Sequence, residues 1–309
     1  MDFKQITYII KVAECRNITK AARELYISQP SLSQLISKAE EELGIRIFDR
    51  NTNPLTLTYA GKRYIEEAKK IIDINENIKK ELQDIAGCQK GLIVLGIPRE
   101  RGSYMLPPLI KRFRERYPEV DIQIVEENTD LLLEHLKKGH LNLIFIPERK
   151  QDEELSYEKI YEEELFLAVG NGVLDRTKCL DGYSDVIDWE KIQDLPFVVL
   201  KQGHGSRKTC EEIFARYGFS PRILLETSSN LTALRMAEEG VAAAIVPEMT
   251  IRLFQGSRRF NTYSLDKEPV TWNVLAVYRK NAYQNAAQKS MIEMAREIFE
   301  KRTKYNYSS

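Results

Sequence analysis

Small polar side chains gather in one segment near the N-terminus, between Ser28 and Lys38. A glutamine amide can pair with an adenine edge in the major groove of DNA, and a serine hydroxyl can bind a base edge or a phosphate oxygen. The residues of this segment that we expect to contact DNA are Ser28, Gln29, Pro30, Ser31, Ser33, Gln34, Ser37 and Lys38. Residue types alone fit the solvated face of a helix in a small helical bundle about as well, so the elements that hold these side chains must decide.

Apolar residues at helical spacing predict two helices around a short turn at residues 26–28. One set follows the i, i+3, i+4, i+7 pattern from Ile18, and another follows it from Leu32. Ser28 can cap the second helix, and Pro30 is tolerated in its first turn. Because the apolar stripe packs inward, Gln34 and its polar neighbours point outward. Two short helices joined by a tight turn form a helix-turn-helix, whose second helix enters the major groove.

A hairpin is expected after this helix pair. Ile45 and Ile47 alternate with a polar residue, residues 51–54 (NTNP) signal a turn, and the alternation resumes at Leu55. A hairpin in this place is a wing. We expect Arg50 at its base to bind phosphate and Asn53 in its turn to contact DNA, although an ordinary surface arginine is equally compatible with the residue type.

The run NITKAARELYISQPSLSQLISKAEEELGIRIFDRNTNPLTLTYAGK, residues 17–62, resembles the N-terminal domain of the LysR-type transcriptional regulators. The matching positions are Ala21-Ala22, Leu25, Ser28-Gln29-Pro30, Ser31, Leu32-Ser33, Glu40, Leu43-Gly44, Phe48, Arg50, Leu57-Thr58 and Ala60-Gly61. The resemblance implies a winged helix-turn-helix that binds DNA. The chain departs from the family pattern at Gln34, Leu35 and Ser37, so its recognition helix is less basic than usual and its operator sequence is left open.

A long helix is predicted from Thr58 to about Ile85, a stretch that contains no proline. Steps of four and three residues connect Tyr64, Ala68, Ile71, Asn75, Ile78, Leu82 and Ile85. This is a heptad seam on a helix about 40 Å long, with Asn75 at a position where one polar residue often sets the register. A dimer is favoured over packing on the chain's own domain. The resemblance implies that this helix pairs the DNA-binding domains and that dimers pair into tetramers, and a two-fold dimer implies an operator with approximate dyad symmetry.

The remaining chain alternates strands and helices after a hinge expected between Gly87 and Gly91. The expected strands are 92–97, 120–125, 141–146, 197–200, 222–226 and 242–246, the expected helices are 103–117, 129–138, 206–217 and 230–239, and segment 170–188 is unassigned. This order predicts two α/β lobes with mostly parallel sheets. They are similar to the periplasmic-binding-protein fold, as the resemblance also implies through residues such as Tyr117-Pro118 and Gly205-Ser206-Arg207.

The expected fold is therefore an α/β multidomain protein. It has an N-terminal winged helix-turn-helix (residues 1–58), a linker and dimerisation helix (59–87) and a two-lobed effector-binding domain (91–309). Lobe I is expected at 91–162 and 268–309, and lobe II at 163–267.

A ligand site is expected between the lobes, because ligands of open α/β sheets bind beyond the carboxyl ends of strands, beside helix N-termini. This rule and the resemblance together select Arg99, Arg101, Gly102, Ser103, Asn128, Thr129, Pro147, Gln202, His204, Gly205, Ser206, Arg207, Thr227 and Ser228 as effector contacts. Arginines beside free helix-start amides favour a small anion such as a carboxylate. Ser103, Thr129 and Ser206 fit the alternative role of simple helix caps.

Other classes of protein are less consistent with the sequence. Four scattered cysteines and three scattered histidines have no metal-ligand spacing, and no metal or cofactor is expected. Oxidant-sensing members of the resembling family have a cysteine at the place of Gly205, and Cys210 has no obvious resolving partner, so redox sensing is disfavoured.

Bulk composition neither supports nor excludes DNA binding. Residues 1–58 hold eight basic and seven acidic side chains, a surplus of one, and the whole chain is neutral. No apolar run is long enough to span a membrane and no secretory signal is recognised, so a cytoplasmic location is expected.

A small-molecule-processing enzyme fused to a DNA-binding domain is the main alternative, but no nucleophile elbow, phosphate loop or HExxH motif occurs and no catalytic residue is expected. A purely architectural DNA binder and a solute-binding protein fit the two-part chain less well.

Overall fold

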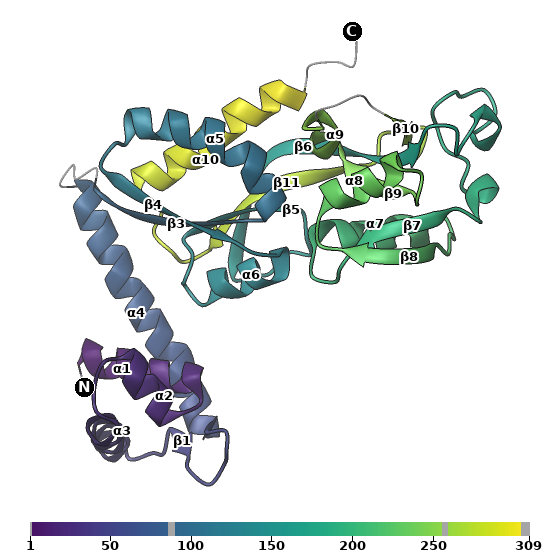
Figure 1. Ribbon diagram of the computed structural model, residues 1–309. Helices are drawn as coiled ribbons and strands as arrows, with labels where there is room; N and C mark the ends of the chain where they lie inside the picture. Colours follow the sequence, from purple (N-terminus) through teal and green to yellow (C-terminus); the bar gives the residue numbers. More distant parts are fainter. Residues whose placement is uncertain (1, 86–89, 255–258, 304–309) are drawn as a thin grey trace. The chain divides into compact units, whose positions relative to one another are not determined.

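The computed structural model describes residues 2–85, 90–254 and 259–303 (Figure 1). The chain divides into two compact units, unit 1 with residues 1–87 and 281–283 and unit 2 with residues 88–280 and 284–309. The hinge expected between Gly87 and Gly91 falls mainly on residues 86–89, which lie outside the described residues.

Unit 1 contains the expected helix-turn-helix and hairpin. In chain order its elements are α1 (Phe3–Cys15), α2 (Ile18–Glu24), α3 (Gln29–Leu43), β1 (Phe48–Asp49), β2 (Thr56–Leu57) and α4 (Tyr59–Ile85). The stripe of α3 is buried through Leu32, Ile36 and Ala39. Ser28 caps α3, as predicted, by accepting a hydrogen bond from the amide of Ser31 at 3.2 Å. These contacts fix which face of α3 remains in solvent.

The hairpin is shorter than expected, and the prediction that its first strand begins at Ile45 is wrong. Gly44 adopts a left-handed conformation with φ of 66° and ends α3, while the amide of Ile45 still donates to the carbonyl of Glu40 at 3.1 Å. Residues 44–46 therefore complete the helix terminus instead of pairing as a strand. The antiparallel pairing begins at Phe48, which faces Leu57.

Helix α4 begins at Tyr59 and continues to Ile85 without interruption, as predicted. Its first turns pack on the core of unit 1, where Ile65 and Ala68 are buried. Further along, four apolar side chains of one stripe are exposed: Ile71, Ile74, Ile78 and Leu82 at 44%, 58%, 50% and 59%. The helix thus carries an apolar stripe that unit 1 does not cover.

Unit 2 is built on a mixed sheet in the order β10-β6-β11-β5-β3-β4, with β9 also paired to β6. Its strands are β3 (Gly91–Ile97), β4 (Val120–Glu126), β5 (Leu143–Pro147), β6 (Leu155–Gly170), β9 (Ala244–Pro247), β10 (Phe260–Ser264) and β11 (Thr271–Arg279). Strand β3 is parallel to β4 and β5, but β6 and β11 are antiparallel to their neighbours. The expectation of mostly parallel sheets is therefore wrong, because the two strands that run between the lobes return in the opposite direction.

Lobe I consists of β3, β4, β5 and the parts of β6 and β11 paired beside them. Helices α5 (Arg99–Arg116) and α10 (Ala286–Thr303) cover one face of its sheet, and α6 (Thr129–Lys137) covers the other (Figure 1). Helix α5 begins at Arg99, four residues before the predicted start at Ser103, because Pro98 serves as its N-cap. The loop expected to face the ligand is consequently the first turn of a helix.

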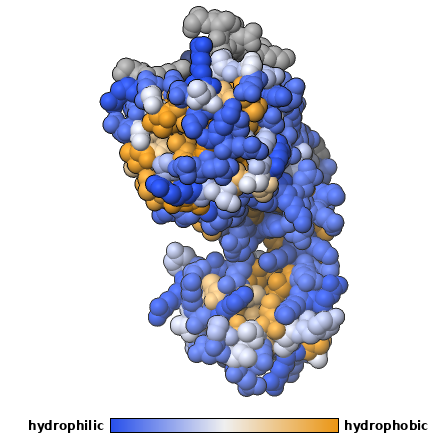
Figure 2. All heavy atoms as spheres, turned by 90° about the vertical axis from the view of Figure 1, so that its right-hand side faces the viewer, coloured by the Kyte–Doolittle hydropathy of each residue, from blue (hydrophilic) through white to orange (hydrophobic). Residues whose placement is uncertain are grey.

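Lobe II contains the second half of β6, β9, β10 and the parallel pair β7 (Pro196–Leu200) and β8 (Arg222–Thr227). Its helices are α7 (Gly205–Arg216), α8 (Asn230–Glu238) and α9 (Glu248–Arg252). Two short 3-10 turns, η1 (Arg176–Lys178) and η2 (Trp189–Ile192), belong to the segment that the sequence left unassigned and its continuation. Figure 2 shows apolar side chains among hydrophilic ones on its outer face, and β8 exposes Ile223 and Leu224.

Candidate DNA-binding surface and effector cleft

The outer face of α3 presents the polar side chains predicted to contact DNA. Gln29, Pro30, Ser31, Gln34, Ser37 and Lys38 are exposed, together with Ser28 before the helix, and Ser33 is half-buried. Among the described residues, no partner binds the side chains of Gln34 or Lys38. Both side chains are therefore available to a groove, whereas Ser28 and Ser31 bind each other at 2.7 Å.

Arg50 connects the wing to α3. Its guanidinium donates to the hydroxyl of Ser37 at 2.9 Å and to the Glu40 carboxylate at 3.0 Å. The other oxygen of Glu40 accepts from the amides of Ile47 and Phe48 at 2.8 and 3.1 Å. Arg50 is 43% exposed, so N–H groups remain available for a phosphate while the side chain holds the hairpin in place. Asn53 is exposed in the turn of the hairpin.

Two exposed tyrosines of unit 1 escaped sequence reasoning. Tyr26 lies in the turn of the helix-turn-helix and is 95% exposed, with φ of 55°. Tyr59 begins α4 and is 83% exposed. Apolar periodicity in the sequence does not predict the exposure of a single aromatic side chain, so neither tyrosine was found.

A cavity of about 430 Å³ opens between the lobes of unit 2. Ten of the predicted effector residues line it: Arg99, Arg101, Asn128, Thr129, Pro147, His204, Gly205, Ser206, Thr227 and Ser228. Four others do not line it: Gly102, Ser103, Gln202 and Arg207. The lining residues outside the predicted set include Glu100, Tyr104, Glu126, Glu127, Leu200, Ser229, Asn230, Pro247, Thr250 and Trp272. The lining joins the carboxyl ends of strands to helix starts in both lobes.

Ser103, Thr129 and Ser206 were possible helix caps, but none of their hydroxyls caps a helix in the structure. Ser103 lies inside α5 and donates to the carbonyl of Glu100, Asn128 is the cap of α6, and α7 has no side-chain cap. Thr129 and Ser206 are only 1% and 7% exposed, yet neither hydroxyl has a hydrogen-bond partner among the described residues. Two unused hydroxyls, one from each lobe, therefore line the same cavity.

The lobes approach each other closely beside these hydroxyls. A Cβ atom added at Gly205 would lie 2.2 Å from Cγ of Pro147, far inside van der Waals contact. Glycine is therefore required at the start of α7, where it lets the helix begin against the end of β5.

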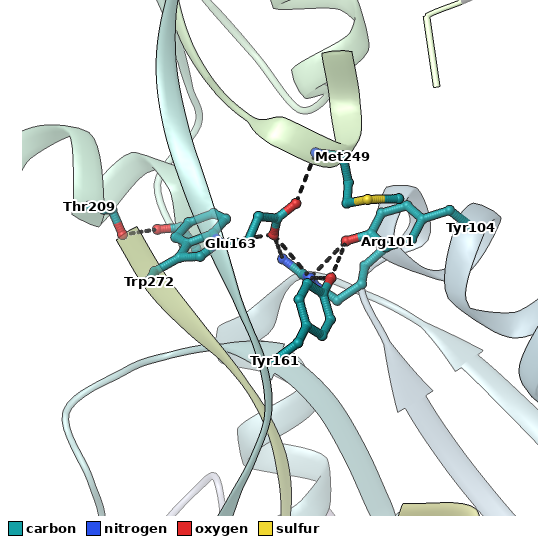
Figure 3. A network of polar contacts seen from close by, with 8 residues as sticks. Arg101, Tyr104, Tyr161, Glu163, Thr209, Met249 and Trp272 are labelled. Carbon is teal, nitrogen blue, oxygen red and sulfur yellow. Dashed lines mark hydrogen bonds and ion pairs between the residues drawn. The ribbon is translucent and has the colours of Figure 1, made fainter. Parts of the chain in front are cut away.

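Arg101 lies in the cavity wall, but its charge is already matched (Figure 3). Its guanidinium donates to the hydroxyls of Tyr104 and Tyr161, each at 2.7 Å, and forms an ion pair of 3.3 Å with Glu163. Burial alone lowers the pKa of Arg101, but the surrounding phenols and carboxylate outweigh it and raise the pKa above its ordinary value. The guanidinium is thus charged and neutralised inside the protein.

Glu163 extends this network to the strands that join the lobes. One of its oxygens accepts from the amide of Met249 at 3.1 Å, and the other accepts from the indole of Trp272 at 2.9 Å. Burial is the largest of the causes that raise the pKa of Tyr104, so its phenol remains protonated. The network ties α5 to β6, α9 and β11, and leaves little of the Arg101 charge for a ligand.

The other charges around the cavity are mixed. Arg207 does not line the cavity; it binds Glu211 and Glu226 and donates to the carbonyl of Leu200. Burial lowers the pKa of His204, which favours the neutral ring. Arg99 is an exposed cation of the cavity without a partner in the described ranges, and two exposed carboxylates, Glu126 and Glu127, line it as well.

Other kinds of site find no support in the described residues. They contain no group of three or more histidine, cysteine or acidic side chains placed to hold a metal ion. Burial raises the pKa of the Cys210 thiol to about 12, which suppresses its reactive thiolate. No described helix has the length and apolarity needed to cross a membrane.

Both units match family models of known proteins. Residues 3–62 match the family model of the bacterial regulatory helix-turn-helix proteins of the LysR family, and residues 86–300 match the LysR substrate binding domain. The chain is 31% identical over 96% of its length to YcgK of Bacillus subtilis, an uncharacterized HTH-type transcriptional regulator, with 94% of that protein covered. It is 26% identical to BsdA of the same organism over 92% of this chain and 96% of that one.

Solved structures agree in fold. Full-length OxyR of Pseudomonas aeruginosa is similar with a TM-score of 0.69 at 21% identity, over 96% of this chain and 95% of that one. CbnR complexed with its target DNA is similar with a TM-score of 0.57 at 22% identity, over 96% and 99%. A helix-turn-helix joined to a ligand-binding domain defines a one-component regulator. The chain belongs to the LysR family and is a DNA-binding transcription regulator with an effector-binding domain.

Proposed function

We propose that the effector of this regulator is a small molecule with an anionic group, such as a carboxylate, and that it binds in the cavity of unit 2. The observation that carries the proposal is the pair of unpartnered hydroxyls on the largely buried residues Thr129 and Ser206, which line the cavity beside the uncapped start of α7. Free backbone amides at a helix N-terminus favour a negative charge. Arg99 supplies the one cation at the cavity that no described residue neutralises.

Effector binding between the lobes changes their closure and thereby the spacing of the DNA-binding domains in the assembled protein. Such coupling requires the effector to bind one arrangement more tightly than the other. The operator has approximate dyad symmetry, α3 enters the major groove, and the wing contacts phosphate. A related fold, CbnR, has been solved with its target DNA.

Self-association through α4 is part of the proposal, because its apolar stripe is exposed in the single chain. Dimers then associate into tetramers.

We assign residues 1–58 to DNA binding, 59–87 to pairing and 91–309 to the effector, with lobe I at 91–162 and 268–309 and lobe II at 163–267. The regulator acts in the cytoplasm, where its operator lies, and no residue is assigned a catalytic role.

Calorimetric titration of the full chain with a panel of small organic acids, amines and neutral analogues tests the effector proposal. We expect only acids to bind, and Ser206→Ala and Thr129→Val to weaken that binding by about tenfold each. Ser103→Ala is the matched control, because this hydroxyl lies on α5 outside the cavity. Binding confined to neutral or cationic compounds would overturn the proposal, as would equal losses in the control.

A further inference from the structure

Helices α7 and α8 of lobe II both begin at the cavity, but their first turns differ. The N-terminus of α7 has no side-chain cap. In α8 the hydroxyl of Ser229 accepts from the amide of Thr232 at 3.0 Å, which satisfies one of the free donors. The remaining amides of the first turn of α8 are bound by a residue of the opposite lobe.

That residue is Glu100, in the first turn of α5. One carboxylate oxygen accepts from the amide of Asn230 at 2.8 Å. The other accepts from the amide of Leu231 at 3.1 Å and from the hydroxyl of Ser229. A carboxylate on the amides of a helix N-terminus is the arrangement that a bound anion adopts. Lobe I therefore supplies an anion to lobe II across the cleft.

We propose that Glu100 is an internal ligand of α8 that sets which effectors the cleft accepts. Its carboxylate occupies the amides at the N-terminus of α8. The acidic group of a ligand therefore binds at the N-terminus of α7, and a ligand with two acidic groups has no second anion-binding site in the cleft. The same contact holds the two lobes together on the α5 side of the cavity. This inference rests on the proposed function in one respect, namely that this cavity is the effector-binding site.

The neighbouring charges distinguish Glu100 from the other acids of the cavity. Glu126 and Glu127 line it but have no partner among the described residues, so neither satisfies a helix terminus. Arg101 is neutralised by Glu163 and does not compete for Glu100. Removing Glu100 therefore leaves the amides of Asn230 and Leu231 without an acceptor at a helix N-terminus that faces the cavity.

Hydrogen exchange and thermal unfolding of the full chain test the assignment with sodium sulfate as the probe. In Glu100→Ala we expect the amides of Asn230 and Leu231 to exchange about ten- to a hundredfold faster than in the wild type. Millimolar sulfate should restore part of the protection and raise the Tm of this variant above the rise in sodium chloride of equal ionic strength. Glu127→Ala is the matched control, since it removes a carboxylate of the same cavity without freeing a helix terminus.

Glu100→Gln provides a second variant that keeps the shape of the side chain. A neutral acceptor binds amides less strongly than a carboxylate, so we expect intermediate exchange at Asn230 and Leu231. Unchanged exchange in both Glu100 variants would overturn the inference, and so would an equal effect of sulfate on the wild type, Glu127→Ala and Glu100→Ala. Because sulfate replaces the effector in this test, its failure would leave the Ser206 and Thr129 result standing, and the reverse also holds.

Discussion

Tyr26 has a backbone conformation that tyrosine rarely adopts. With φ of 55° it follows Leu25, the C-cap of α2, and its amide donates to the carbonyl of Arg23 at 3.1 Å. A left-handed conformation costs a non-glycine residue about 1–2 kcal/mol, less for asparagine. Because the side chain is 95% exposed, removing it forfeits almost no packing.

We therefore expect Tyr26→Asn to raise the free energy of unfolding of the N-terminal domain by up to about 1 kcal/mol. Scanning calorimetry would record the change as a higher Tm. Tyr59→Asn is the control, because Tyr59 is also exposed but lies in a helix. A gain in the control as large as that of Tyr26→Asn would show that exposed aromatic surface, and not backbone strain, is responsible.

The thiol of Cys210 is buried, and we expect it to be unreactive in the folded protein. Its thiol is 5% exposed and its pKa is raised to about 12, chiefly by burial. At pH 8 the thiolate is then a minute fraction of the native protein, and alkylation becomes appreciable only as the pH approaches the raised pKa or when the domain unfolds. We expect iodoacetamide at pH 8 to leave Cys210 intact in the folded chain and to modify it in guanidinium, as measured by peptide mass spectrometry. Rapid modification of the folded protein would contradict this and reopen redox sensing.

At the scale of elements, Glu40 holds the wing on the recognition helix. Its carboxylate accepts from two backbone amides of the hairpin and from Arg50. Removing it leaves three donors without their acceptor, so we expect Glu40→Ala to lower the free energy of unfolding by about 1.5–3 kcal/mol. Urea unfolding followed by circular dichroism would measure the loss. Glu41→Ala, an exposed neighbour without a partner in the described chain, should change it by less than about 0.5 kcal/mol; equal losses would refute the assignment.

Helix α4 makes a separate prediction about assembly. Ile78 belongs to the exposed apolar stripe, whereas Lys69 is exposed on the opposite side of the helix. If the stripe pairs two chains, Ile78→Asn removes buried apolar surface and weakens the dimer by about tenfold or more. Sedimentation equilibrium of the full chain would measure this, with Lys69→Asn as control. A dimer unaffected by Ile78→Asn would place the pairing elsewhere.

Across the whole molecule, local sequence patterns predicted the features that depend on neighbouring residues: helix starts, buried helix faces and the positions of most strands. The stripe that begins at Leu32 predicted which face of α3 is buried, and Ser28 predicted where the helix starts. Alternating strands and helices predicted β3 through β5 and β7 through β9 within a few residues. Strands β6, β10 and β11 were missed. Charged residues at 162–164 interrupt the apolar pattern of β6, and all three strands pair antiparallel with segments that are distant along the chain.

The cavity shows the same division. Helix starts such as Ser206 were found by the rule that ligands bind at strand ends, whereas the contact of Glu100 with α8 was not predicted. Its partners, Asn230 and Leu231, are 130 and 131 residues away along the chain, so no local signal connects them. Burial of Glu163 and the closed contacts of Arg207 likewise depend on tertiary packing that single-sequence patterns do not contain.

Selection from a randomised DNA pool tests whether α3 reads a dyad-symmetric operator. The full chain should enrich two inverted half-sites about one helical turn apart, or a multiple of that spacing. Gln34→Ala should relax the base preference at one position of each half-site by about 1–3 kcal/mol, while Glu41→Ala leaves the motif unchanged. Sequencing that finds no motif enriched over the input pool, or an identical motif for Gln34→Ala, would show that α3 does not read the operator in this way.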